Sequence, residues 1–189
     1  MQIIDNINNT IKKDLQTVIK EGSKISIAAA CFSIYAYQEL KGQLEDITEL
    51  RFIFTEPTFV TEKTPKVRRE FYIPRISRER SLYGTEFEVK LRNELTQKAI
   101  AKECVDWIRK KVTFQSNVTD ENMMGFMTVD QSTYMPINGF TTVDLGCDRG
   151  NNAYYPVQKT ESYENANYFL NLFEELWNDK KKLQEVTDV

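Results

Sequence analysis

The chain has 189 residues, of which 41% are hydrophobic and 28% charged, and its net charge at pH 7 is −3. This length and composition predict one folded domain with a substantial core. They exclude a disordered chain and a polycation that binds DNA over its whole surface. No apolar stretch approaches the length of a membrane span, and the N-terminus lacks an apolar signal core. We therefore expect a cytoplasmic protein that makes no membrane contact.

The sequence contains no histidine and three cysteines. Without histidine, the chain itself cannot supply a His general base, a His-ligated metal site, or a Ser-His or Cys-His pair. Cys31, Cys104 and Cys147 form no C-x-x-C pair, and Cys31 and Cys104 fall in apolar patterns. We expect buried, reduced thiols here rather than a disulfide, and no metal site.

The first third of the chain predicts a β-α-β unit. Apolar residues at helical spacing over 4–19 predict a first helix, with Asp5 as an early cap. The β-branched apolar run 24–33 predicts a buried strand, 34–44 a short amphipathic helix, and 50–55 a second buried strand. Because the links between these elements are short, we expect the two strands to be parallel.

The rest of the chain predicts a long excursion and then further α/β elements. Residues 56–84 contain three prolines without sustained periodicity, and we expect them to leave the sheet, with an extended basic part at 61–84. The other expected elements are a long helix at 85–112, a strand at 112–117, a β-hairpin of 125–130 and 132–138, a loose loop at 146–158 and a final helix at 165–186. The expected fold class is α/β, a mixed β-sheet flanked by helices with a terminal β-hairpin.

Residues 61–80 concentrate positive charge. Seven basic and three acidic residues give this segment a local charge of +4, so the rest of the chain carries −7. Arginines that neutralise phosphates, interleaved with aromatic rings that stack on bases, suit single-stranded or flexible nucleic acid. The candidate nucleic-acid-binding residues are Lys63, Lys66, Arg68, Arg69, Phe71, Tyr72, Arg75, Arg78 and Arg80. The alternative is a solvated loop whose arginines pair with nearby acids such as Glu86 and Glu88.

The hairpin resembles the signature region of the phospholipase D phosphodiesterase superfamily. That signature reads His-x-Lys, then an Asp five residues after the Lys, then Gly-Ser and an Asn. With Asp130 on the family Asp, Met123 takes the position of the His and Gly125 that of the Lys. The resemblance therefore implies that the nucleophilic His and the phosphate-binding Lys are absent.

The run "PINGFTT" (136–142) departs from the family pattern in a similar way. Pro136 and Ile137 replace Gly-Ser and Gly139 replaces the Asn, whereas the following Phe-Thr fits the family. The polar residues that remain are candidates for a degenerate pocket: Asp130, Asn138, Thr141, Thr142 and Asp144. Asx and Thr residues are also what hairpin turns and strand ends need for local hydrogen bonds, which is the structural alternative.

The resemblance extends over nearly the whole chain. The runs "SKISIAAACFSIYAYQEL", "LRFIFTEPTF" and "YMPINGFTTVDLG" are similar to the N-terminal phospholipase D-like segment of some bacterial DEAD/DEAH-type, chromatin-remodeller-like superfamily II helicases. In such proteins a two-lobed ATPase follows, which needs ATP and Mg²⁺. This chain has no G-x-x-x-x-G-K-[ST] loop, so no cofactor is expected in it. We expect residues 1–189 to form a single phospholipase D-like domain of a longer helicase.

Three functions are compatible with these patterns. The first is a non-catalytic helicase module that engages DNA or RNA. The second is an interaction domain that docks on the downstream ATPase lobes or forms a homodimer, without nucleic-acid contact. The third and most remote is a phosphodiesterase or nuclease half-site that depends on a partner for its catalytic groups. Binding to nucleic acid that weakens with salt separates the first function from the second.

Overall fold

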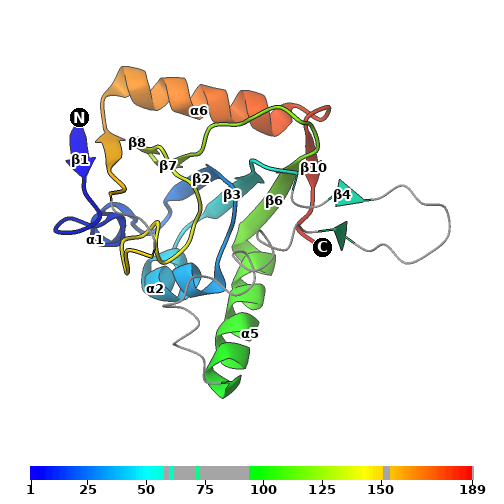
Figure 1. Cartoon of the computed structure of the whole chain (residues 1–189), viewed down its shortest axis with the longest axis horizontal. Helices are drawn as coiled ribbons and strands as arrows, with labels where there is room; N and C mark the ends of the chain where they lie inside the picture. Colours follow the sequence, from blue (N-terminus) through cyan, green and yellow to red (C-terminus); the bar gives the residue numbers. More distant parts are fainter. Residues whose placement is uncertain (58–59, 62–70, 73–93, 151–153, 189) are drawn as a thin grey trace.

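A mixed eight-stranded sheet with helices on both faces forms the centre of the protein in a computed structural model (Figure 1). The strand order is β1-β9-β8-β7-β2-β3-β6-β10. The structure describes residues 1–57, 60–61, 71–72, 94–150 and 154–188. The predicted α/β class, with a mixed sheet, flanking helices and a β-hairpin, is confirmed.

Eight strands form the large sheet, and four helices are described. The strands of the large sheet are β1 (Gln2–Ile4), β2 (Lys24–Ala29), β3 (Glu49–Phe54), β6 (Val112–Asn117), β7 (Phe126–Val129), β8 (Ser132–Met135), β9 (Val157–Thr160) and β10 (Leu183–Glu185). The helices are α1 (Ile11–Val18), α2 (Ile34–Leu44), α5 (Glu94–Lys111) and α6 (Tyr163–Asn178).

The predicted β-α-β unit is confirmed. Strands β2 and β3 are parallel, with Ile25 opposite Leu50, and β6 joins β3 in the same direction. Helix α2 starts where predicted because the Ser33 side chain accepts a hydrogen bond from the backbone N–H of Tyr35 at 3.1 Å. Every other pairing in the sheet is antiparallel. Because β2, β3 and β6 run in the same direction, their carboxyl ends lie together at one end of the strands, which we call the carboxyl edge.

The prediction of a helix from residue 4 is wrong at its start. Residues 2–4 form β1, and the helix begins only at Ile11, after its N-cap Thr10. Asp5 is not the cap, because its carboxylate accepts hydrogen bonds from the backbone N–H groups of Ile7, Asn8 and Asn9 and so closes the connecting loop. Pairing of β1 with β9 outweighs the helical spacing of the isoleucines.

Two predictions in the C-terminal half also need correction. The final helix ends at Asn178 rather than 186, since the chain turns and adds β10 antiparallel to β6. The loop predicted at 146–158 gives way at Val157 to strand β9, which pairs with both β8 and β1. The long helix is confirmed as α5 from Glu94, and the earlier part of its predicted range lies outside the described residues.

The core lies on both faces of the sheet. Helices α1, α2 and α5 pack on one face, and α6 covers the other, where Phe126, Phe169 and Phe173 form a separate cluster. The indole N–H of Trp107 on α5 donates to the Leu44 carbonyl at the end of α2, at 2.8 Å. Among the described residues, no helix has both the length and the apolar character that crossing a membrane requires.

A buried polar network fastens α1 to the sheet. The ammonium of Lys159, whose side chain is only 7% exposed, lies 3.0 Å from the Asp14 carboxylate and 3.0 Å from that of Glu161. The hydroxyl of the fully buried Tyr134 donates to Asp14 at 2.7 Å. These bonds compensate for burying the Lys charge and hold α1 against β8 and β9.

The three cysteines were predicted to be buried, and this is confirmed for Cys104 alone. Cys104 is buried on α5, and burial raises its pKa to about 12, so it stays protonated and unreactive. Cys31 and Cys147 are half-buried near the carboxyl edge of the sheet and in the loop that follows it.

Candidate functional site

The carboxyl edge of the parallel strands is the place where open α/β sheets usually bind ligands. In this protein, residues 136–142 cross that edge. The Ala30 N–H donates to the Asn138 carbonyl at 2.8 Å, and the Phe140 N–H donates to the Cys31 carbonyl at 2.8 Å. The chain that follows the hairpin therefore lies along the continuation of β2.

Gly125, directly before β7, makes the tightest contact at this edge. The Ile137 N–H donates to the Gly125 carbonyl at 2.9 Å. A Cβ atom on Gly125 would lie 1.7 Å from the Ile137 carbonyl oxygen and 3.2 Å from that of Ala28. No side chain fits at this position without displacing backbone, so the position that resembles the family Lys is closed to any residue but glycine.

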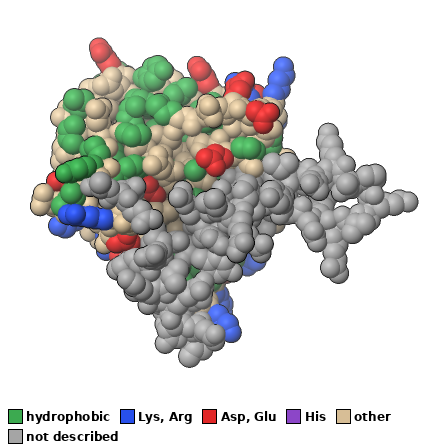
Figure 2. All heavy atoms as spheres, viewed as in Figure 1, with side chains coloured by type: hydrophobic (Ala, Val, Ile, Leu, Met, Phe, Trp, Pro, Cys, Tyr) green, Lys and Arg blue, Asp and Glu red, His purple; other side chains and the backbone are tan. Residues whose placement is uncertain are grey.

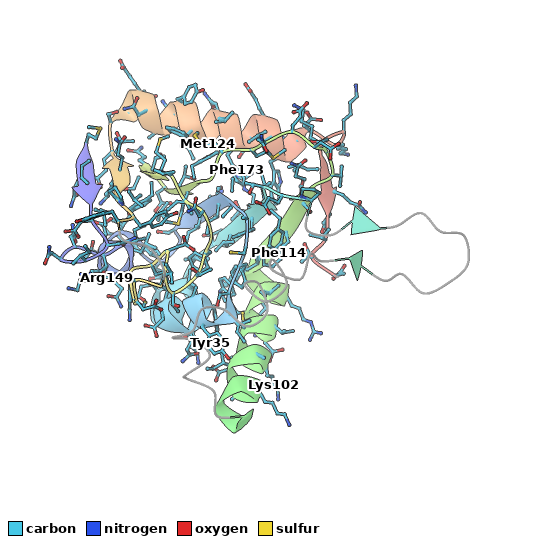
Figure 3. All side chains as sticks on the ribbon, viewed as in Figure 1. Tyr35, Lys102, Phe114, Met124, Arg149 and Phe173 are labelled. Carbon is cyan, nitrogen blue, oxygen red and sulfur yellow. The ribbon has the colours of Figure 1, made fainter. Side chains whose placement is uncertain are left out.

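Met123, at the position that resembles the family His, has a packing role. Its side chain is half-buried and contacts the hydrophobic cluster beneath α6. Met124 beside it is 48% exposed and lies next to α6 (Figure 3). A thioether cannot attack phosphorus as an imidazole does, so this position contributes packing and no nucleophile.

Aromatic rings fill the interior behind the edge. Phe32 and Phe140 stack at 5.5 Å between centroids, and Phe32 meets Phe114 edge-on at 5.4 Å. Phe114, in the middle of the molecule in Figure 3, also contacts Phe52 and Phe54. Phe32 and Phe140 are 7% and 3% exposed. This Phe cluster occupies space that a ligand cleft would need.

Asp144 is the buried acid of the site. The Thr141 hydroxyl donates to its Oδ2 at 2.6 Å, and the Gly139 N–H and Tyr155 hydroxyl also donate to the carboxylate. Burial nevertheless raises the pKa of Asp144 to about 6, because desolvation outweighs these hydrogen bonds. A Cβ on Gly139 would lie 2.8 Å from Asp144 Oδ2, so this second glycine lets the chain pass close to the acid.

Asp130 does not join the other predicted pocket residues. It occupies the hairpin turn with φ 51°, and its carboxylate accepts from the Ser23 hydroxyl at 2.8 Å and the Lys24 N–H at 2.9 Å. Lys24 begins β2, whereas Asn138 and Thr141 lie near the strand's carboxyl end. Asp130 therefore stabilises the hairpin at the opposite end of the sheet.

Of the remaining pocket candidates, Thr141, Thr142 and Asp144 are buried, whereas Asn138 is exposed and takes part through its backbone N–H. The Asn138 N–H donates to the Tyr155 hydroxyl at 2.7 Å, and Thr141 bonds Asp144. Thr142 is fully buried, with its hydroxyl 3.5 Å from Asp148. Tyr155 was missed from the sequence because it falls in a segment predicted as loose loop. Gly125 and Gly139 could have indicated the packing at this site, since a Gly beside a strand often marks close approach of another backbone.

All seven basic candidates lie outside the described residues: Lys63, Lys66, Arg68, Arg69, Arg75, Arg78 and Arg80. Phe71 and Tyr72 form the short strand β5, which pairs antiparallel with β4 (Val60–Thr61) and so places a small two-stranded sheet within the excursion. Among the described residues, no group of three or more Cys, Asp or Glu side chains is arranged to hold a metal ion.

Comparisons with known proteins give a distant structural match. No family model matches the chain, and no curated protein does. Among solved structures, the archaeal chromatin protein TrmBL2, described as showing a novel mode of DNA binding, matches with a TM-score of 0.48 and 11% sequence identity. The match covers 98% of this chain and 53% of that one, so the chain spans about half the length of that structure.

Replacing Gly125 with alanine tests the closure of the edge. We expect Gly125→Ala to lower the free energy of unfolding by about 2–4 kcal/mol, since its Cβ would overlap the Ile137 carbonyl. Gly42→Ala is the matched control, because a Cβ there meets nothing within 4 Å and lies in helix α2. It should stabilise the chain by about 0.5–1 kcal/mol. Urea unfolding followed by tryptophan fluorescence measures both, and equal effects of the two substitutions would contradict the packing seen here.

The pKa of Asp144 predicts how stability depends on pH. The folded chain holds this proton more tightly than the unfolded chain, in which an Asp pKa is about 4. The free energy of unfolding should therefore fall as pH rises from about 4 to about 6, by roughly 2–3 kcal/mol, and level off above.

Asp144→Asn carries no titratable proton and should remove that fall in urea unfolding measured at stepped pH. The exposed Asp120 supplies the control, Asp120→Asn, which should leave the profile unchanged. An unaltered pH profile in Asp144→Asn would show that this carboxyl is not the buried acid described here.

Proposed function

We propose that the chain is a non-catalytic, phospholipase D-like module that binds nucleic acid within a longer ATP-dependent helicase. The observation that carries this proposal is the 61–80 segment, in which seven basic residues lie on both sides of the aromatic pair Phe71 and Tyr72 in an otherwise acidic chain. A charge of +4 in twenty residues against −7 in the rest makes this segment the place where a polyanion is attracted.

The closed edge of the sheet supports the non-catalytic part of the proposal. Glycine and methionine stand where the resemblance implies lysine and histidine, and the Gly125 position is too tight for any side chain. A scaffold that keeps its core but fills its reaction site with phenylalanine can still present loops to a ligand. ATP and Mg²⁺ then belong to the lobes of the parent chain.

Helix α5, which follows the 61–80 segment in the sequence, also carries positive charge. It carries the exposed side chains of Lys98, Lys102, Arg109 and Lys110. Lys102 lies midway along α5 (Figure 3). Acidic Glu103 and Asp106 partly offset these charges, so α5 supports phosphate contact rather than forming a site alone.

Salt dependence of binding tests the proposal. We expect weak, sequence-tolerant binding, micromolar at low salt, with a slope of log K against log salt of about −0.7 to −0.9 for each phosphate neutralised. Two to four contacts are plausible for this segment, and stacking on Phe71 or Tyr72 would add about 1–3 kcal/mol per base. Arg68→Ala with Arg69→Ala should flatten the slope by about one to two. Fluorescence anisotropy with labelled single-stranded and duplex oligonucleotides, from about 25 to 200 mM salt, measures it.

The matched control is Lys180→Ala with Lys181→Ala, an exposed basic pair in the turn after α6. It should leave the slope unchanged. Absence of binding at the lowest salt, or equal binding by the Arg68/Arg69 double variant and the native chain, would favour docking on the ATPase lobes instead.

A further inference from the structure

Strand β1 leaves one edge of the sheet open. It is the last strand in the order and pairs on one side only, with β9. Among the described residues, its outward backbone groups have no hydrogen-bond partner. An open edge is a template for another strand unless charge, proline, a bulge or a very short strand length protects it. The sequence here, Gln2-Ile3-Ile4, carries no charge and no proline, and its short length is the one protection it has.

Exposed hydrophobic side chains gather around this edge. Of nine large hydrophobic residues that are exposed in the described structure, five lie on or beside β1: Met1 (90%), Ile3 (56%), Ile7 (41%), Tyr154 (85%) and Tyr163 (71%). Hydrophobic surface accordingly covers the side of the molecule where β1 and the start of α6 lie (Figure 2). Such a cluster marks an interaction surface rather than ordinary scatter.

Contacts connect these residues into one surface. Ile7 and Tyr154 line the same shallow hollow. Gln2 is opposite Lys159 in the sheet, which brings Met1 beside the chain that leads to Tyr163. The surface thus runs from the hollow, along β1, to the first turn of α6.

The other edge strand is different. Strand β10 contains Glu185 and follows three consecutive lysines, so its own edge is charged. A strand that pairs with β1 must be uncharged and have a free edge of its own. Of the two edge strands of the eight-stranded sheet, β1 meets both conditions.

We propose that β1 pairs antiparallel with β1 of a second copy of this chain, so that two sheets become one. A two-fold axis at Ile3 places Ile3 opposite Ile3 of the partner and Gln2 opposite Ile4 of the partner. No like charges meet across this axis. Ile4 faces the core of its own subunit, so Ile3 points to the opposite face of the sheet, where α6 lies. Ile3 and Tyr163 are exposed and can therefore contact the second copy. Because β1 is only three residues long, the exposed aromatic side chains supply much of the contact.

Sedimentation velocity of the full chain, from about 1 to about 300 µM, tests this arrangement. A monomer–dimer equilibrium with a micromolar Kd is expected. Ile3→Lys places two like charges together at the axis and should weaken dimerisation at least about tenfold. Val105→Lys replaces another exposed hydrophobic residue, on α5, and should leave the Kd unchanged. Circular dichroism and the Tm of both variants should equal those of the native chain.

A charge-complementation experiment tests whether the contact lies at Ile3. An equimolar mixture of Ile3→Lys and Ile3→Glu should recover dimers that neither variant forms alone, because opposite charges then meet at the axis. A native chain that stays monomeric throughout would overturn the proposal. Dimers that resist Ile3→Lys, or a mixture that stays monomeric while native dimers form, would overturn it as well.

Discussion

The close approach of the Gly125 and Ile137 backbones determines the shape of the carboxyl edge. A hydrogen bond of 2.9 Å and a clearance that excludes even a Cβ hold residues 136–142 against β7 and β2. From this contact follow the positions of Phe140 in the aromatic cluster and of Thr141 beside Asp144. Residues 136–142 and the Phe cluster therefore fill the carboxyl edge of the parallel strands.

Local patterns predicted the elements that the chain forms by short-range rules. The β2-α2-β3 unit, β6 and the hairpin were predicted from apolar runs, although Asp130 lies in the hairpin turn and not in the predicted strand 125–130. The strands of the large sheet that were missed, β1, β9 and β10, are three or four residues long and exist because a distant strand pairs with them. Their sequences carry too few residues for a period, and in β1 the isoleucine spacing matched a helix instead.

In the candidate site, too, local features could be predicted from the sequence and long-range contacts could not. The resemblance of the hairpin to the phospholipase D signature is a prediction from the sequence, and the structure adds that residue 125 has no room for a side chain. The grouping of Asp130 with Asn138 failed because a hairpin places its turn and its ends at opposite edges of a sheet. The contact of Tyr155 with Asp144 depends on how the loop after residue 146 folds back, which no spacing in the sequence encodes.

Hydrolysis of a phosphodiester measures the consequence of the closed edge most directly. Purified chain would be incubated with bis-p-nitrophenyl phosphate, with and without divalent metal, and p-nitrophenol release followed against a buffer blank. A domain whose reaction site is filled by Gly125, Met123 and the Phe cluster should give no release above the blank. Release that follows the protein through purification and is lost in Asp144→Asn would contradict the proposed non-catalytic role.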